Sequence, residues 1–188
     1  MTANTGQARP DDSWLSQLKE EILDPDLPIV DPHHHLWLRN GYSYLMPEFA
    51  VDLDSGHNVV ATVFAECHSM YRKDGPEHER SLGETEFVRG QAAMSDGGQY
   101  GRTRACQALF GNVDLTLGAD VSVLLEKHTD ASGGRFRGVR YSTGWDGDER
   151  IQNVVANPNM LVDARVMNAA RVLVEKTCRL IVGFIIRN

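Results

Sequence analysis

Short apolar runs alternate with amphipathic segments along most of the chain. Continuous apolar runs at 29–33, 59–66, about 106–111 and about 136–141 predict strands, and a fifth run covers 179–186. Such runs, apolar at successive positions, are typical of parallel strands that are buried on both faces. Apolar residues at helical spacing occupy 84–95 and 120–128, and a third such stretch begins after Asp163, which can cap a helix. The alternation predicts β/α units.

A polar leader precedes the first predicted strand. Apolar residues recur at helical spacing between Trp14 and Leu23, behind polar residues that can cap a helix, and Pro25 and Pro28 then end it. We therefore expect an N-terminal extension with a helix over residues 1–27. Residues 28–188 are expected to form one domain.

The first strand leads directly into an acid and three histidines, in the segment IVDPHHHLW at 29–37. Because alternate side chains of a strand share a face, His33 and His35 are expected to point the same way. Two neutral imidazoles on one face can reach one cation such as zinc, iron, nickel or manganese. The spacing predicts a pair of metal ligands, and the alternative is a polar, histidine-rich turn.

Further polar side chains follow other predicted strands. The segments after strands are long, as in 36–58, and in parallel β/α architectures these loops build the active site. Glu66 is expected to ligate a metal, orient a ligand or form a salt bridge at the rim. Arg140 is expected to clamp a substrate carboxylate or lactone oxygen, or to pair with Glu66 or Asp146. His68 is a weaker candidate, and His57, His78 and His128 are expected at the surface.

Composition narrows the class of protein. Hydrophobic residues make up 41% and charged residues 24% of the chain, which is enough for a packed core. The formal net charge of −7 disfavours a nucleic-acid or anionic-membrane partner. The three cysteines include no CxxC pair, which indicates a reducing compartment, and we expect a cytoplasmic protein. No apolar run reaches the ~18 residues of a membrane span.

The segment PIVDPHHHLW resembles the first-strand motif of the amidohydrolase-related (amidohydrolase 2) family, in the branch of sugar-lactone and dicarboxylate-lactone hydrolases and some decarboxylases. The segments VFAECHSMYRKDGPE, FVRGQAAMS, CQALFGNVDLTLG and GGRFRGVRYSTGWD resemble, in that order, later segments of lactonase-like members. The matches cover residues 28 to 175. This resemblance implies the distorted (β/α)8 TIM-type barrel of metal-dependent hydrolases.

Length limits how much of that barrel is expected. A complete barrel takes ~250 residues, and this chain has 188. We therefore expect a partial (β/α)8 barrel, a C-terminally truncated fragment with about the first four to five β/α units. The open edge of such a sheet, with the apolar segment RLIVGFII exposed near the terminus, predicts aggregation or assembly with another copy.

The resemblance also implies a function. It implies hydrolysis of a lactone, or of a related cyclic ester or amide, by a polarised water, with a divalent metal such as zinc or manganese on His33 and His35 and with Glu66 and Arg140 as catalytic residues. The expected partner is a small-molecule substrate, an anionic or hydroxylated lactone. Some branches work without tightly bound metal, so a metal-free mechanism stays open. A non-catalytic barrel fragment and a family decarboxylase are the alternatives.

Overall fold

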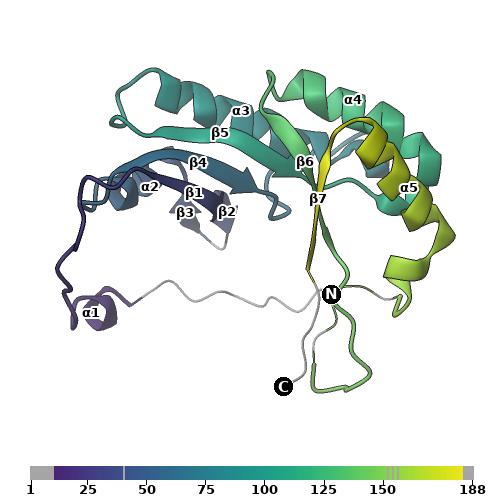
Figure 1. Cartoon of the computed structure of the whole chain (residues 1–188), viewed down its shortest axis with the longest axis horizontal. Helices are drawn as coiled ribbons and strands as arrows, with labels where there is room; N and C mark the ends of the chain where they lie inside the picture. The colour runs from purple at the N-terminus through teal and green to yellow at the C-terminus, as the bar shows by residue number, and fades with distance from the viewer. Residues whose placement is uncertain (1–10, 40, 152, 154, 156, 184–188) are drawn as a thin grey trace.

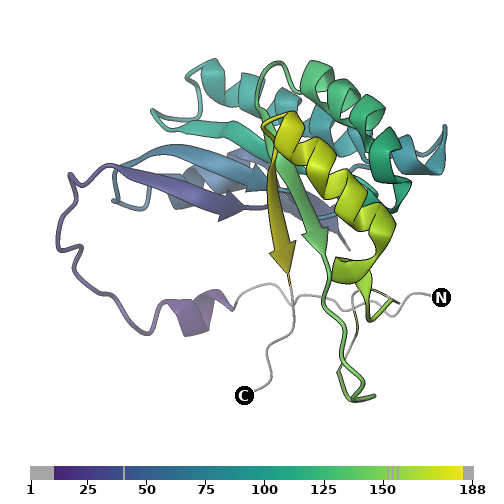
Figure 2. The same cartoon turned by 45° about the vertical axis from the view of Figure 1, so that its right-hand side comes forward.

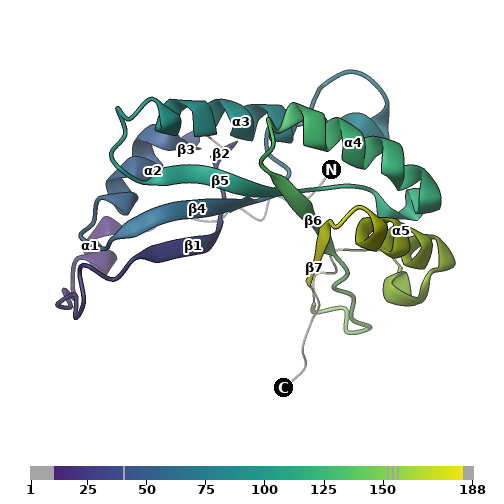
Figure 3. The ribbon, with the colours of Figure 1, turned by 45° about the horizontal axis from the view of Figure 1, so that its top comes forward.

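The computed structural model describes residues 11–39, 41–151, 153, 155 and 157–183. Its centre is a sheet of five parallel strands in the order β1-β4-β5-β6-β7, and Figure 3 shows them from one edge to the other. The strands are β1 (Ile29–His34), β4 (Val59–Ala65), β5 (Arg104–Gly111), β6 (Phe136–Ser142) and β7 (Arg179–Gly183). The predicted strands are thus confirmed, and residues 184–186 of the fifth run lie outside the described residues.

Three long helices lie together on one face of this sheet (Figures 1 and 2). They are α3 (Leu82–Asp96), α4 (Val121–Ala131) and α5 (Ala164–Glu175), and they confirm the three predicted helices. Consecutive parallel strands joined by right-handed crossovers place all their helices on the same side, which explains this arrangement. Short 3-10 helices precede them: η1 (Glu77–Glu79), η2 (Leu115–Asp120) and η3 (Met160–Val162).

The core fills the space between these helices and the sheet. Val139 of β6, Val88 of α3 and Ala169 of α5 are fully buried there, as are Leu109 and Leu125. Among the described residues no helix covers the opposite face of the sheet (Figure 1). Apolar strand residues are accordingly part exposed, as with Ile181 at 36%.

The segment 36–58, expected as a loop, holds structure of its own. Strands β2 (Trp37–Arg39) and β3 (Tyr42–Tyr44) form an antiparallel hairpin, and α2 (Met46–Leu53) follows. The start of α2 is stabilised by the Glu48 carboxylate, which accepts the Leu45 N–H at 2.9 Å.

The predicted N-terminal helix is much shorter than expected. Only α1 (Asp12–Leu15) forms, although the apolar spacing continues to Leu23. Leu18 is 72% and Leu23 98% exposed, so the apolar positions have no surface to pack against. Short helices without tertiary packing are marginal in water, which accounts for the difference.

The expected partial (β/α)8 barrel, and with it the distorted metal-dependent hydrolase barrel, is wrong. The described residues form an open α/β structure with one curled five-stranded parallel sheet, and β1 and β7 are its edges. A barrel needs strands that close on each other with a fixed stagger, and hydrophobic runs in a sequence carry no information on closure. The β2–β3 hairpin also interrupts the regular β/α alternation between β1 and β4. None of the helices in the described part of the chain is long and apolar enough to cross a membrane.

Gly138 of β6 allows β7 to pair closely with it. Gly138 lies opposite Arg179, and a Cβ at position 138 would overlap the Arg179 carbonyl. Gly138→Ala is therefore expected to lower the free energy of unfolding by about 2 kcal/mol, because the backbone pairing must shift. Chemical denaturation measures the change. Gly90→Ala is the control, since a Cβ there meets nothing within 4 Å; equal effects of the two substitutions would contradict the prediction.

Candidate active site

The two predicted metal-ligand histidines lie together at the carboxyl end of β1. Between them His34 is buried, and its ring stacks on that of Phe49 with centroids 4.3 Å apart. Burial lowers the pKa of His34 to about 4, so it is neutral in the fold. The His34 side chain points toward the helices that cover the sheet, so the His33 and His35 side chains point to the opposite face. The Nε2 atoms of His33 and His35 are 3.2 Å apart.

The orientation of His35 is fixed by the neighbouring strand. Its Nδ1 lies 2.8 Å from the Ala65 carbonyl oxygen at the end of β4. A carbonyl only accepts, so Nδ1 carries the proton and the Nε2 lone pair faces His33. Burial lowers the pKa of His35, which favours this neutral form. Histidines that bind metals usually make this kind of hydrogen bond through the second nitrogen.

The distance between the Nε2 atoms fits two ligands of one metal ion. Nitrogen ligands at ~2.0–2.1 Å from a tetrahedral cation lie about 3.3 Å apart, and the observed separation is 3.2 Å. The described residues contain no group of three or more His, Cys, Asp or Glu arranged to hold a metal ion. The spacing of His33 and His35 is compatible with two ligands of one ion, and metal binding itself, like the choice between zinc and manganese, stays a prediction.

Glu66 and Arg140 meet beside this pair. The Glu66 side chain is only 2% exposed, and Arg140 Nη1 lies 3.2 Å from its Oε1. The same Nη1 donates to the Glu66 carbonyl oxygen at 2.8 Å. On the other side, Nε2 of the exposed His68 is 3.5 Å from Glu66 Oε2. Of the two partners considered for Arg140, the structure shows Glu66.

A second arginine, not identified from the sequence, lies at the same edge. Arg39 of β2 donates to the Cys67 carbonyl oxygen, and its guanidinium lies 5.0 Å from the centre of the Trp37 ring. Arg39 and Arg140 thus donate to the carbonyl oxygens of two consecutive residues, Cys67 and Glu66, directly after β4. Both arginines also contribute to the lowered pKa of His35, after its burial. Glu66 pairs with Arg140, and the remaining N–H donors of the two guanidinium groups suit an anionic group.

The loop that carries His68 is held in a strained backbone conformation. His68 and Met70 have φ angles of 60° and 54°, which residues other than glycine rarely adopt. The buried Glu84, at the start of α3, accepts the N–H groups of Cys67 at 3.0 Å and Ser69 at 2.8 Å. Glu84 therefore fixes the loop on both sides of His68.

The Glu84 carboxyl predicts a pH dependence of stability. Burial raises its pKa to about 7, so the folded chain holds a proton that the unfolded chain releases between about pH 4.5 and 7. Its contribution is therefore lost as the pH rises through that range, by roughly 3 kcal/mol at most. Glu84→Gln mimics the protonated form, so the variant is expected to match the wild type at pH 5 and exceed it at pH 8. Denaturant unfolding at both values measures this, and a difference that does not change with pH would contradict it.

His128, expected at the surface, belongs to the core. Its Nδ1 lies 2.8 Å from Thr85 Oγ1 and its Nε2 3.3 Å from Ser81 Oγ, and its ring stacks on Phe136. Burial lowers its pKa to about 4. His128 on α4 thus joins α4 to α3 and stands apart from the candidate site.

Comparison with protein-family models, with curated proteins and with solved structures finds no match to this chain. The resemblance to amidohydrolase-related proteins therefore rests on sequence segments such as PIVDPHHHLW alone. The side chains at the carboxyl ends of β1, β4 and β6 are the main structural basis for a function.

Proposed function

We propose that this protein hydrolyses a lactone, or a related cyclic ester or amide, by directing a polarised water at the carbonyl carbon. The observation that carries the proposal is the pair of His33 and His35 Nε2 atoms, which lie 3.2 Å apart, with the His35 ring oriented by the Ala65 carbonyl. Paired imidazoles with this spacing suit a shared cation, and the resemblance to lactonase-like proteins supports this chemistry.

His33 and His35 would hold a divalent metal, zinc or manganese. Such an ion lowers the pKa of a bound water and polarises a carbonyl. Arg140 uses one guanidinium nitrogen for Glu66 and keeps other donors, and 29% of its side chain is exposed. Those donors can bind the carbonyl oxygen, where negative charge develops in the transition state.

His68 and Glu66 form the pair that can move a proton. The His68 ring is 65% exposed, whereas Glu66 is buried behind it at 3.5 Å. An exposed imidazole can take a proton from the attacking water, and the carboxylate stabilises the imidazolium that results. The same proton can then pass to the leaving oxygen. Glu66 would thus orient both Arg140 and His68.

The two arginines bear on the class of substrate. Arg39 and Arg140 favour a small substrate with an anionic group, in line with an anionic lactone.

The cysteines bear on the cellular compartment. Cys67, Cys106 and Cys178 are free thiols in the described part of the chain, which supports a cytoplasmic protein. The part-exposed face of the sheet supports assembly with another copy.

A screen of sugar lactones tests the proposal. We expect lactone opening, followed as acid release in a pH-stat, to accelerate when the purified chain is supplied with Zn²⁺ or Mn²⁺ and to stop with a chelator. Thermal unfolding with each ion reports binding independently of turnover, because a ligand of the native state stabilises it. No acceleration with any divalent ion, or carbon dioxide release from aromatic or enoic acids instead, would overturn it.

A further inference from the structure

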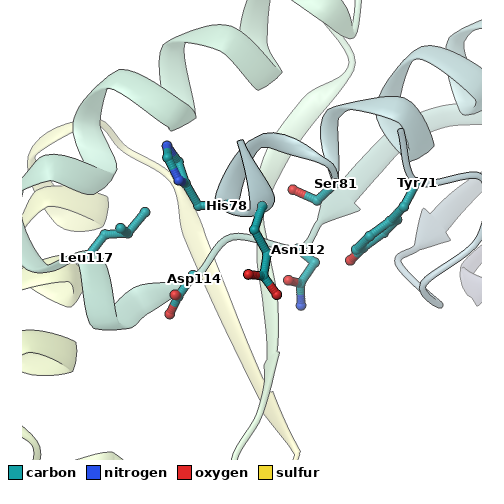
Figure 4. A pocket seen from close by; sticks show the side chains of 7 residues that line it. Tyr71, His78, Ser81, Asn112, Asp114 and Leu117 are labelled. Carbon is teal, nitrogen blue, oxygen red and sulfur yellow. The ribbon is translucent and has the colours of Figure 1, made fainter. Parts of the chain in front are cut away.

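A pocket of about 350 Å³ opens between the loop after β4 and the loop after β5. In Figure 4, Tyr71 and Ser81 lie on one side of it and Asp114 and Leu117 on the other. The pocket borders the candidate active site, because the Tyr71 ring lies 5.3 Å from that of His68. Its lining comprises Tyr71, Glu77, His78, Ser81, Asn112, Asp114 and Leu117.

The charge of this lining is one-sided. Glu77 and Asp114 contribute carboxylates, and none of the lining residues is a lysine or arginine. Asp114 already accepts the N–H of Thr116 at 2.9 Å and its hydroxyl at 2.6 Å. Glu77 makes no side-chain hydrogen bond or ion pair with any other described residue. Arg165, which is outside the lining, already interacts electrostatically with Asp114, so Glu77 is the carboxylate of this pocket without a partner among the described residues. Such a carboxylate repels an anion and attracts a cation.

The neutral groups of the lining suit the same kind of ligand. The Tyr71 hydroxyl is buried and lacks a hydrogen-bond partner among the described residues, and burial raises the pKa of Tyr71. A buried hydroxyl without a partner is costly, and its oxygen can accept an N–H. The Asn112 carbonyl oxygen is a further acceptor, and Leu117 offers apolar contact to methylene groups.

We propose that this pocket binds a small organic cation, a protonated amine on a short alkyl chain. The ammonium group lies between the acceptors of Glu77, Tyr71 and Asn112, and its chain lies against Leu117. This inference is independent of the proposed hydrolase activity, because it rests on the loops after β4 and β5 and on neither of the paired histidines.

Three probes with the same carbon chain test the proposal: butylamine, butanol and butyrate. Saturation-transfer NMR on the full chain at pH 8, followed by titration, gives the affinity of each. We expect butylamine to bind and butyrate not to bind, with butanol at least fivefold weaker than the amine. Equal binding of butanol and butylamine would show a pocket for hydroxyl or apolar groups, and absence of amine binding would equally overturn the proposal.

Matched variants locate the binding. Glu77→Gln keeps the shape of the side chain, removes the charge and is expected to weaken butylamine at least fivefold. Glu175→Gln makes the same change at an exposed position at the end of α5, far along the chain from the pocket, and is expected to leave the affinity unchanged. Equal losses in the two variants would mean that the amine responds only to the net charge of the protein.

Discussion

Replacing His33 by alanine is expected to lower lactone turnover at least 100-fold and to leave the fold intact. The change removes one of the two Nε2 atoms that lie 3.2 Å apart, so a shared cation loses a ligand. Changes to groups that only orient a ligand already cost ~10–100-fold in metal affinity or activity, and loss of a ligand is expected to cost more. The fold is expected to survive because His33 is exposed. Rates at saturating and low substrate, together with a metal titration, measure both effects.

His57→Ala is the matched control, because His57 is an exposed histidine between α2 and β4. It is expected to change neither the rate nor the metal affinity. Turnover that persists in His33→Ala would show that the first-strand histidines are not catalytic. Loss of metal affinity with full turnover would instead favour a mechanism in which arginine and histidine polarise the carbonyl.

Much of the sheet could be predicted from the sequence because its strands are continuous apolar runs. The segment VVATVFA, for example, forms β4 over Val59–Ala65, and Ala164–Glu175 forms the helix that Asp163 caps, with the Asp163 carboxylate accepting the Arg165 N–H at 2.8 Å. These signals are local, so short windows of sequence suffice to find them.

The features that were missed or wrong depend on contacts between distant segments. The β2–β3 hairpin has strands of three residues each, too short for a clear periodic pattern. The predicted helix after Ser13 has apolar residues at helical spacing, but no other part of the described structure packs against them, so most of the helix does not form. Barrel closure depends on the stagger of whole strands, and the sequence reports only their apolar character.

The candidate site could be predicted in part, since the carboxyl ends of parallel strands meet at one edge. From that rule we predicted that His33, His35, Glu66 and Arg140 lie at the same edge of the sheet. Arg39 was missed because it lies on the unpredicted hairpin. Glu84 was missed because an acidic residue in the first turn of a helix is common, and its contacts with Cys67 and Ser69 are not visible in the sequence.

Arg140→Met is expected to lower the free energy of unfolding by about 3–5 kcal/mol. Methionine retains the apolar part of the side chain, yet it leaves the buried Glu66 carboxylate without the partner that lies 3.2 Å from Oε1. It also removes the hydrogen bond to the Glu66 carbonyl oxygen. Because 29% of the Arg140 side chain is exposed, the loss is expected near the lower end of this range. Chemical denaturation at pH 7.5 measures it.

A double-mutant cycle with Glu66→Gln separates a structural role of Arg140 from a role in substrate binding. Glu66→Gln alone leaves a part-exposed arginine in water, so its cost is expected to be small, and the double variant should be more stable than Arg140→Met. Because Glu66 is itself proposed to take part in the reaction, the turnover of the double variant is compared with that of Glu66→Gln alone. The remaining donors of Arg140 are expected to bind the substrate carbonyl, so we expect the double variant to turn over at least tenfold more slowly than Glu66→Gln. Equal turnover of these two variants would assign Arg140 to the fold alone, as the partner of a buried carboxylate.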